Sequence, residues 1–134
     1  MSSIQEYAFR ILITSDDQTY RNALANRLRI DGHAVEFANG GFHLCHMLEK
    51  YQTQNLLIIH ENQFDMPAHE IISLVRVNFN KHDLPILFIT KSKSDEDIKD
   101  IISSGGNEYI IQASNFANVL DKVKKYHSLI NKAS

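Results

Sequence analysis

The chain has 134 residues, a length typical of one domain with a core of ordinary size. Its formal net charge of −2 lacks the basic excess that nucleic-acid binding needs, and no apolar run approaches the ~20 residues of a membrane span. The single cysteine, Cys45, excludes an internal disulfide and fits a reducing compartment. We therefore expect a cytoplasmic domain that binds neither nucleic acid nor membrane.

Short apolar runs alternate with segments of helical periodicity along the chain. Strands are predicted at residues 11–13, 34–38, 56–60, 85–90 and 108–111. After each strand, apolar residues recur at helical spacing; in chain order they are Tyr20, Leu24 and Leu28, then Leu44, Cys45, Leu48 and Tyr51, then Ile71, Ile72, Val75 and Phe79, then Ile98, Ile101 and Ile102, and last Phe116, Val119, Leu120, Val123 and Ile130. Five such units predict an α/β fold of the flavodoxin-like (βα)5 type, a doubly wound parallel sheet in the order 2-1-3-4-5.

Capping residues mark the expected ends of these helices. The predicted N-terminal signals are Asp16 or Asp17, Pro67 as a first helical residue, Ser94 or Asp95, and Ser114 or Asn115. The predicted stop signals are Asp31-Gly32 and Gly105-Gly106. We expect a tail at 1–9 and a single domain at 10–131.

The strand at 56–60 is a buried apolar run that ends in His60, followed by Glu61-Asn62. Ligands of open α/β sheets lie beyond the carboxyl ends of the strands. In the predicted strand order, several polar residues converge there with His60: Ser15, Asp16, Glu61, Asn62, Thr90, Lys91 and Gln112.

At these segments the chain resembles the receiver domains of bacterial two-component response regulators. The resemblance rests on four segments: Arg10–Asp17, Leu56–Arg76, Pro85–Thr90 and Gly105–Tyr109. It implies a cytoplasmic role in two-component or phosphorelay signal transduction, with Thr90 at the hydroxyl switch position and Tyr109 at the aromatic switch position.

The departures from the family pattern lie at the phosphorylation site. His60 occupies the phosphoacceptor position, and Ser15 replaces one of two acidic Mg²⁺ ligands, which leaves Asp16. Gln112 stands at the position of the family's lysine, and Lys91 stands where a small residue leaves room for phosphate. Mg²⁺ prefers carboxylate and phosphate oxygens, so we expect weak or no Mg²⁺ binding.

Phe64-Asp65 replaces the family's Pro-Gly turn. Together, the departures predict a pseudo-receiver, a non-enzymatic signalling module without a cofactor. It would act by protein–protein interaction, as a homodimer or with other signalling proteins. The expected contact face is formed by the fourth predicted helix, the strand at 108–111 and the last helix, and it carries Ile101 and Tyr109.

His60 also allows other interpretations. It could be a polar filler hydrogen-bonded to Asp16 or Glu61, a pH sensor, a metal ligand together with those two residues, or a phosphohistidine. Asp16 is either a helix N-cap or a residual cation ligand. The Lys91 ammonium either pairs with Asp16 in place of the missing cation or is solvated.

Two alternative functions follow. One is a receiver phosphorylated at an unusual acceptor, His60 or Asp16. The other is a small metal-binding protein or enzyme built around His60, Asp16 and Glu61, which the fold alone does not exclude.

Overall fold

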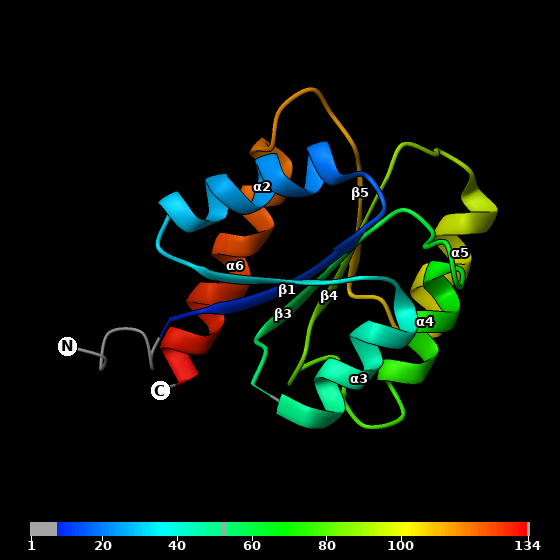
Figure 1. The fold of residues 1–134 in the computed structure, drawn as a ribbon, viewed down its shortest axis with the longest axis horizontal. Coiled ribbons are helices and arrows are strands. Elements are labelled where there is room, and N and C mark those ends of the chain that lie inside the picture. Colours follow the sequence, from blue (N-terminus) through cyan, green and yellow to red (C-terminus); the bar gives the residue numbers. More distant parts are fainter. Residues whose placement is uncertain (1–7, 52, 134) are drawn as a thin grey trace.

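The computed structural model describes residues 8–51 and 53–133 (Figure 1). The strands are β1 (Arg10–Ser15), β2 (Ala34–Ala38), β3 (Leu56–His60), β4 (Ile86–Thr90) and β5 (Glu108–Ile111). The helices are α2 (Gln18–Ile30), α3 (Gly41–Tyr51), α4 (Ala68–Val75), α5 (Asp95–Ser104) and α6 (Ala117–Ala133). The strands pair in parallel in the order β2-β1-β3-β4-β5, which confirms the predicted fold class.

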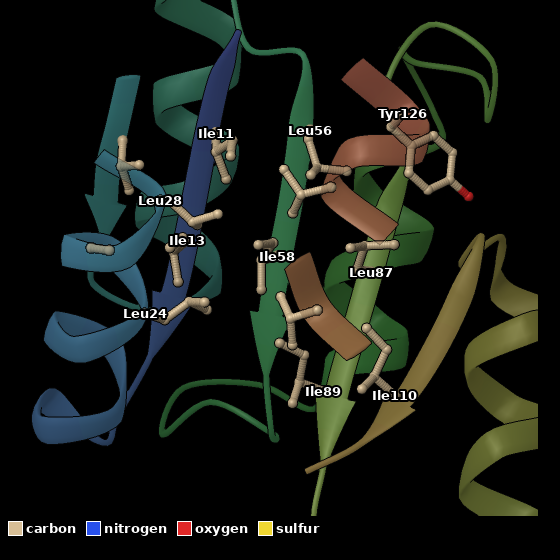
Figure 2. Packing of buried hydrophobic residues seen from close by; sticks show 14 of the residues in the cluster. Ile11, Ile13, Leu24, Leu28, Leu56, Ile58, Leu87, Ile89, Ile110 and Tyr126 are labelled. Carbon is tan, nitrogen blue, oxygen red and sulfur yellow. The ribbon is translucent and has the colours of Figure 1, made fainter. Parts of the chain in front are cut away.

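Two helical layers cover the two faces of the sheet. Helices α2 and α6 lie on one face, and α3, α4 and α5 lie on the other (Figure 1). Figure 2 shows the first core cluster, in which Ile13 and Ile58 of the sheet pack with Leu24 of α2. Alternate strand residues, such as Leu57, face the second layer. Because β1, β3 and β4 are covered on both faces, their sequences are almost continuously apolar.

Most predicted caps are confirmed. Asp17, and not Asp16, is the N-cap of α2, where its carboxylate accepts a hydrogen bond from the backbone N–H of Tyr20 at 3.0 Å. Ser94 caps α5, and Gly105 ends that helix with a φ of 113°. Such a left-handed conformation favours glycine, which explains why this helix stops there.

Three details of the prediction were wrong. Pro67 is the N-cap of α4 and not its first helical residue. The helix ends at Val75, so Phe79 lies beyond it, although it still packs on the core. Ile130 was expected to face the core, but its side chain is 40% exposed.

Arg76, directly after α4, forms hydrogen bonds with the segments that lead into β4 and β5, a role that the sequence did not suggest. Its guanidinium donates to the backbone oxygens of Gly105 and Leu84, both at 2.8 Å, and to the side-chain oxygen of Asn107 at 2.8 Å. Desolvation by burial lowers the pKa of Arg76. The planar guanidinium of Arg76 therefore holds the end of α5 and the segments before β4 and β5 around one charged group.

Most of the predicted tail at 1–9 lies outside the described residues. Phe9 does not, and it is 3% exposed within the first core cluster. The packed domain thus begins at least one residue earlier than predicted. No helix within residues 8–51 and 53–133 combines the length and apolar character needed to cross a membrane.

Candidate functional site

His60 is the centre of a hydrogen-bonded bridge across the carboxyl edge of the sheet. The parallel register of β1 and β3 pairs Ser15 with His60, and Ser15 Oγ lies 2.7 Å from His60 Nδ1. On the other side of the ring, His60 Nε2 lies 2.7 Å from Oε1 of Gln112, which follows β5. We call these three residues, Ser15, His60 and Gln112, the His60 bridge. It joins the ends of β1, β3 and β5, and the predicted bonds from His60 to Asp16 or Glu61 were wrong.

The two bonds use both nitrogens of the imidazole. With the Gln112 carbonyl oxygen as acceptor, Nε2 carries the proton, so in the neutral ring Nδ1 accepts the hydroxyl proton of Ser15. Ser15 Oγ also accepts a hydrogen bond from the backbone N–H of Asp17 at 3.1 Å. His60 itself is only 3% exposed. In this arrangement the ring has no nitrogen left for a metal ion or a substrate.

Tyr20 covers the bridge from the side of α2. The Tyr20 and His60 rings lie with their centroids 4.0 Å apart, tilted by 46°. Burial raises the pKa of Tyr20 to about 12. Because Asp17 caps the helix through the N–H of Tyr20, the start of α2 holds this aromatic ring over the imidazole.

The loop after β3 is shaped by two residues of the predicted acidic pocket. Glu61 adopts a left-handed backbone with a φ of 62°, which is uncommon outside glycine. Its carboxylate accepts a hydrogen bond from the backbone N–H of Lys91 at 3.2 Å. Asn62 accepts one from the N–H of Ala68 at 2.8 Å and so supplies the side-chain cap that Pro67 cannot give α4. Both residues have structural partners that account for their position.

Sequence reasoning missed Gln63, which anchors the same loop. Gln63 is 6% exposed, and its amide donates to the backbone oxygens of His60 at 3.0 Å and Glu61 at 3.1 Å. Its own oxygen accepts a hydrogen bond from the hydroxyl of Thr14 at 2.8 Å. A glutamine in a polar loop carries no sequence signal of burial, so only the fold reveals this contact.

Asp65 was also missed as a functional part of the loop. Its carboxylate accepts hydrogen bonds from the N–H groups of Gly41 at 2.9 Å and Phe42 at 3.0 Å, at the start of α3. Burial raises the pKa of Asp65, but these backbone hydrogen bonds outweigh it, so the pKa lies below its ordinary value. The Gly40-Gly41 sequence gives α3 no capping side chain of its own, and that was the available signal.

Of the two alternatives for Lys91, the structure favours the solvated lysine. Lys91 is exposed, and the ion pairs among the described residues do not include one between Lys91 and Asp16. Nor do His60, Asp16 and Glu61 come together as ligands: within the described ranges no group of three His, Cys, Asp or Glu side chains could hold a metal ion. Mg²⁺, which the receiver resemblance implies, therefore does not fit the residues present.

Thr90 lies at the end of β4 and is 3% exposed. Its hydroxyl oxygen accepts a hydrogen bond from the backbone N–H of Ser92 at 3.0 Å. Beside it, a cavity of about 390 Å³ opens between α4 and α5, and its lining includes Thr90, Glu61 and Asp97. The hydroxyl thus has a local partner in the turn that follows β4.

The predicted contact face is only partly as expected. Tyr109 on β5 is 42% exposed, but Ile101 is 3% exposed and packs into the second core cluster, so its assignment to the face was wrong. The next residue, Ile102, is the exposed one on α5. Beside Tyr109, Glu108 pairs with Lys122 at 2.6 Å and Lys125 at 3.4 Å.

Comparisons with known proteins agree with this architecture. No protein-family model matches the sequence. Chemotaxis protein CheY-3 of Vibrio cholerae serotype O1 is 27% identical over 126 residues, which are 93% of this chain and 96% of CheY-3. Response regulator protein FleR of Pseudomonas aeruginosa is 23% identical over 119 residues, which are 89% of this chain but 24% of FleR. The chain therefore spans about a quarter of that relative's length.

The fold comparison points the same way. The crystal structure of a CheY-like response regulator receiver domain protein from Methanospirillum hungatei JF-1 matches with a TM-score of 0.81 and 21% identity, covering 95% of this chain and 99% of that one. The chain therefore has the CheY-like receiver fold, and its sequence is similar to CheY-3 over most of both proteins. In this fold, the residues that end β1 and β3 and follow β5 are those of the His60 bridge.

Proposed function

We propose that this receiver domain is a pseudo-receiver, a signalling module of the cytoplasm that works without phosphorylation. The observation that carries the proposal is the His60 bridge. The receiver resemblance puts the phosphoacceptor carboxylate at the end of β3, and the residue there is a buried imidazole with both nitrogens bonded. Neither an acceptor carboxylate nor a free nucleophilic nitrogen is available at this position.

The neighbouring residues support the same conclusion. Phosphoryl transfer depends on cations that offset the charge of the transferred group. At the positions where the resemblance places a Mg²⁺ ligand and a lysine, the chain has Ser15 and Gln112, and both are neutral partners of His60. We therefore propose that the domain needs no cofactor and catalyses no reaction.

The test is incubation with acetyl phosphate and Mg²⁺, followed by intact-mass measurement. We expect no mass gain, whereas a receiver domain that keeps the β3 aspartate serves as the positive control. A stable adduct of one phosphoryl group would contradict the proposal. The same reaction on His60→Gln and Asp16→Asn would then show which residue is the acceptor, because only the variant that lacks it would lose the adduct.

We further propose that the domain acts through protein contacts on the face formed by α5, β5 and α6, either with another signalling protein or with a second copy. The exposed side chains of Ile102 and Tyr109 support this assignment, since an aromatic and an aliphatic group beside charged residues are typical of interface centres.

Binding through this face is tested with Tyr109→Glu, measured by pull-down from the native host and by sedimentation velocity. Leu74→Glu is the matched control, because Leu74 is 44% exposed on α4, outside the proposed face. We expect the first variant to lose partner or self-association and the second to keep it. Equal behaviour of the two variants would contradict the assignment.

A further inference from the structure

Two arginines of α2 share one aromatic ring, that of Phe37 on β2. The guanidinium carbon of Arg21 lies 4.3 Å from the centroid of the Phe37 ring, and that of Arg29 lies 5.3 Å from it. Arg29 is held further because its Nη2 donates a hydrogen bond to the backbone oxygen of Val35 at 2.8 Å. Arg29 is exposed, and Arg21 and Phe37 are half-buried, so all three side chains reach the surface at this outer strand of the sheet.

The two guanidinium groups bring positive charge to one place without a carboxylate. The ion pairs among the residues that the structure describes include neither Arg21 nor Arg29. Helix α2 carries three arginines and no acidic residue, whereas the other four described helices each contain at least one carboxylate. Because both charges lie within a Debye length of about 8 Å of the same ring, an anion at that ring would interact with both.

The neighbouring carboxylates are paired with other groups. Glu36, next to Phe37 in β2, forms an ion pair with Arg10 at 3.1 Å. Asp31, at the end of α2, forms one with Arg27 at 3.5 Å. The positive charge beside Phe37 is therefore left for a group from outside the chain.

We propose that Arg21, Arg29 and Phe37 form a binding site for an acidic segment of a partner protein. Carboxylates of that segment contact the two guanidinium groups, and an apolar side chain of the same segment packs on the aromatic ring. We call these three residues the arginine site.

The chemistry of the arginine site favours an acidic peptide over other anions. The planar guanidinium presents paired N–H donors that match the two oxygens of a carboxylate. The aromatic ring between the cations adds apolar contact, and arginine and aromatic residues are enriched where protein interfaces gain most of their affinity. Inorganic phosphate would use the charges but not the ring, and a nucleic acid needs a longer row of cations than these two.

The proposal rests on the proposed role of the domain in protein binding, and it adds a second surface with a partner of stated chemistry. The arginine site lies at β2, whereas the face formed by α5, β5 and α6 lies at the opposite edge of the sheet. Tyr109→Glu should therefore leave binding at the arginine site unchanged, so that the two proposals can fail separately.

The test is an NMR titration of the side-chain Nε–Hε signals of Arg21 and Arg29 with the peptide Glu-Leu-Glu-Leu-Glu at low salt. We expect saturable shifts of both signals, and weaker binding when salt is added, because the charges are near the surface. Arg21→Gln and Arg29→Gln should each weaken peptide binding by about tenfold, since each loses a charge-assisted hydrogen bond. Phe37→Leu should weaken it by about threefold, since the cation–π contacts that place the arginines are lost.

Arg27→Gln is the matched control, because Arg27 is exposed on the same helix and pairs with Asp31. It should bind the peptide as the wild type does, and a loss equal to that of Arg21→Gln would overturn the proposal, since net charge alone would then account for binding. Arg21 has no printed role in holding β2, so its variant tests the site even if Arg29→Gln loosens that strand.

Two other ligands test the class of partner. The peptide Gln-Leu-Gln-Leu-Gln should cause no saturable shift, because it lacks the carboxylates. Inorganic phosphate should not reproduce the shifts at the concentrations at which the acidic peptide saturates them. Equal binding of either ligand, or no saturable shift with the acidic peptide, would overturn the proposal.

Discussion

Replacement of His60 by alanine is expected to destabilise the domain by about 3 kcal/mol. The variant loses two hydrogen bonds, to Ser15 and Gln112, each contributing about 1 kcal/mol net. It also leaves a cavity beneath Tyr20 in place of a ring that is 3% exposed, which costs about 1 kcal/mol or more. Ser15 keeps a second partner in the backbone of Asp17, which limits the penalty of leaving its hydroxyl unpaired.

The assay is urea unfolding, with the free energy of unfolding taken by linear extrapolation. His60→Asn should retain a polar group near Ser15, and His60→Gln should retain one near Gln112, so each is expected to recover part of the loss. His46→Ala is the surface control and should change stability by less than about 0.5 kcal/mol.

A double-mutant cycle with Ser15→Ala separates the bridge from general packing. Because Ser15 and His60 share a hydrogen bond, the stability losses of the two single variants should add up to about 1 kcal/mol more than the stability loss of the double variant. Strict additivity of the two substitutions, or a loss of stability below about 0.5 kcal/mol for His60→Ala, would show that the His60 bridge does not stabilise the fold.

Two further substitutions test other parts of the fold. Asp65→Ala removes the carboxylate that caps α3 at Gly41 and should cost about 1 kcal/mol at neutral pH. Because the pKa of Asp65 is lowered in the folded state, this difference should persist above its unfolded value and shrink as the pH falls through the folded pKa, as urea unfolding in acid would show. An equal cost in acid would exclude the charge as its source. Arg76→Lys keeps the positive charge but loses the planar fork to Gly105 and Leu84, and should cost about 2 kcal/mol in the same assay, whereas wild-type stability would contradict that role.

The fold could be predicted because its signals are local and repeated. Buried parallel strands such as Leu56–His60 are continuous apolar runs, and Gly105 marks a helix end through its backbone conformation. The exceptions lie where one position has two plausible orientations. Ile101 and Ile102 are adjacent and equally apolar, and only the packing of α5 shows that the first is buried and the second exposed.

The position of His60 could be predicted, but its partners could not. Strand order brought Ser15 and Gln112 to the same edge as His60, together with several charged residues that are stronger partners for an imidazole in general. The choice among them depends on side-chain reach. Ser15 is in register with His60, whereas Glu61 turns away because its backbone is left-handed. A sequence carries no direct signal of such geometry.

We propose that the His60 bridge holds the carboxyl edge of the sheet in one state, whether or not a phosphodonor is present. The most direct measurement is the backbone amide NMR spectrum recorded with and without acetyl phosphate and Mg²⁺. We expect the amide signals of Ser15, His60, Tyr109 and Gln112 to stay at the same chemical shifts. A new, saturable set of signals for these residues would contradict it.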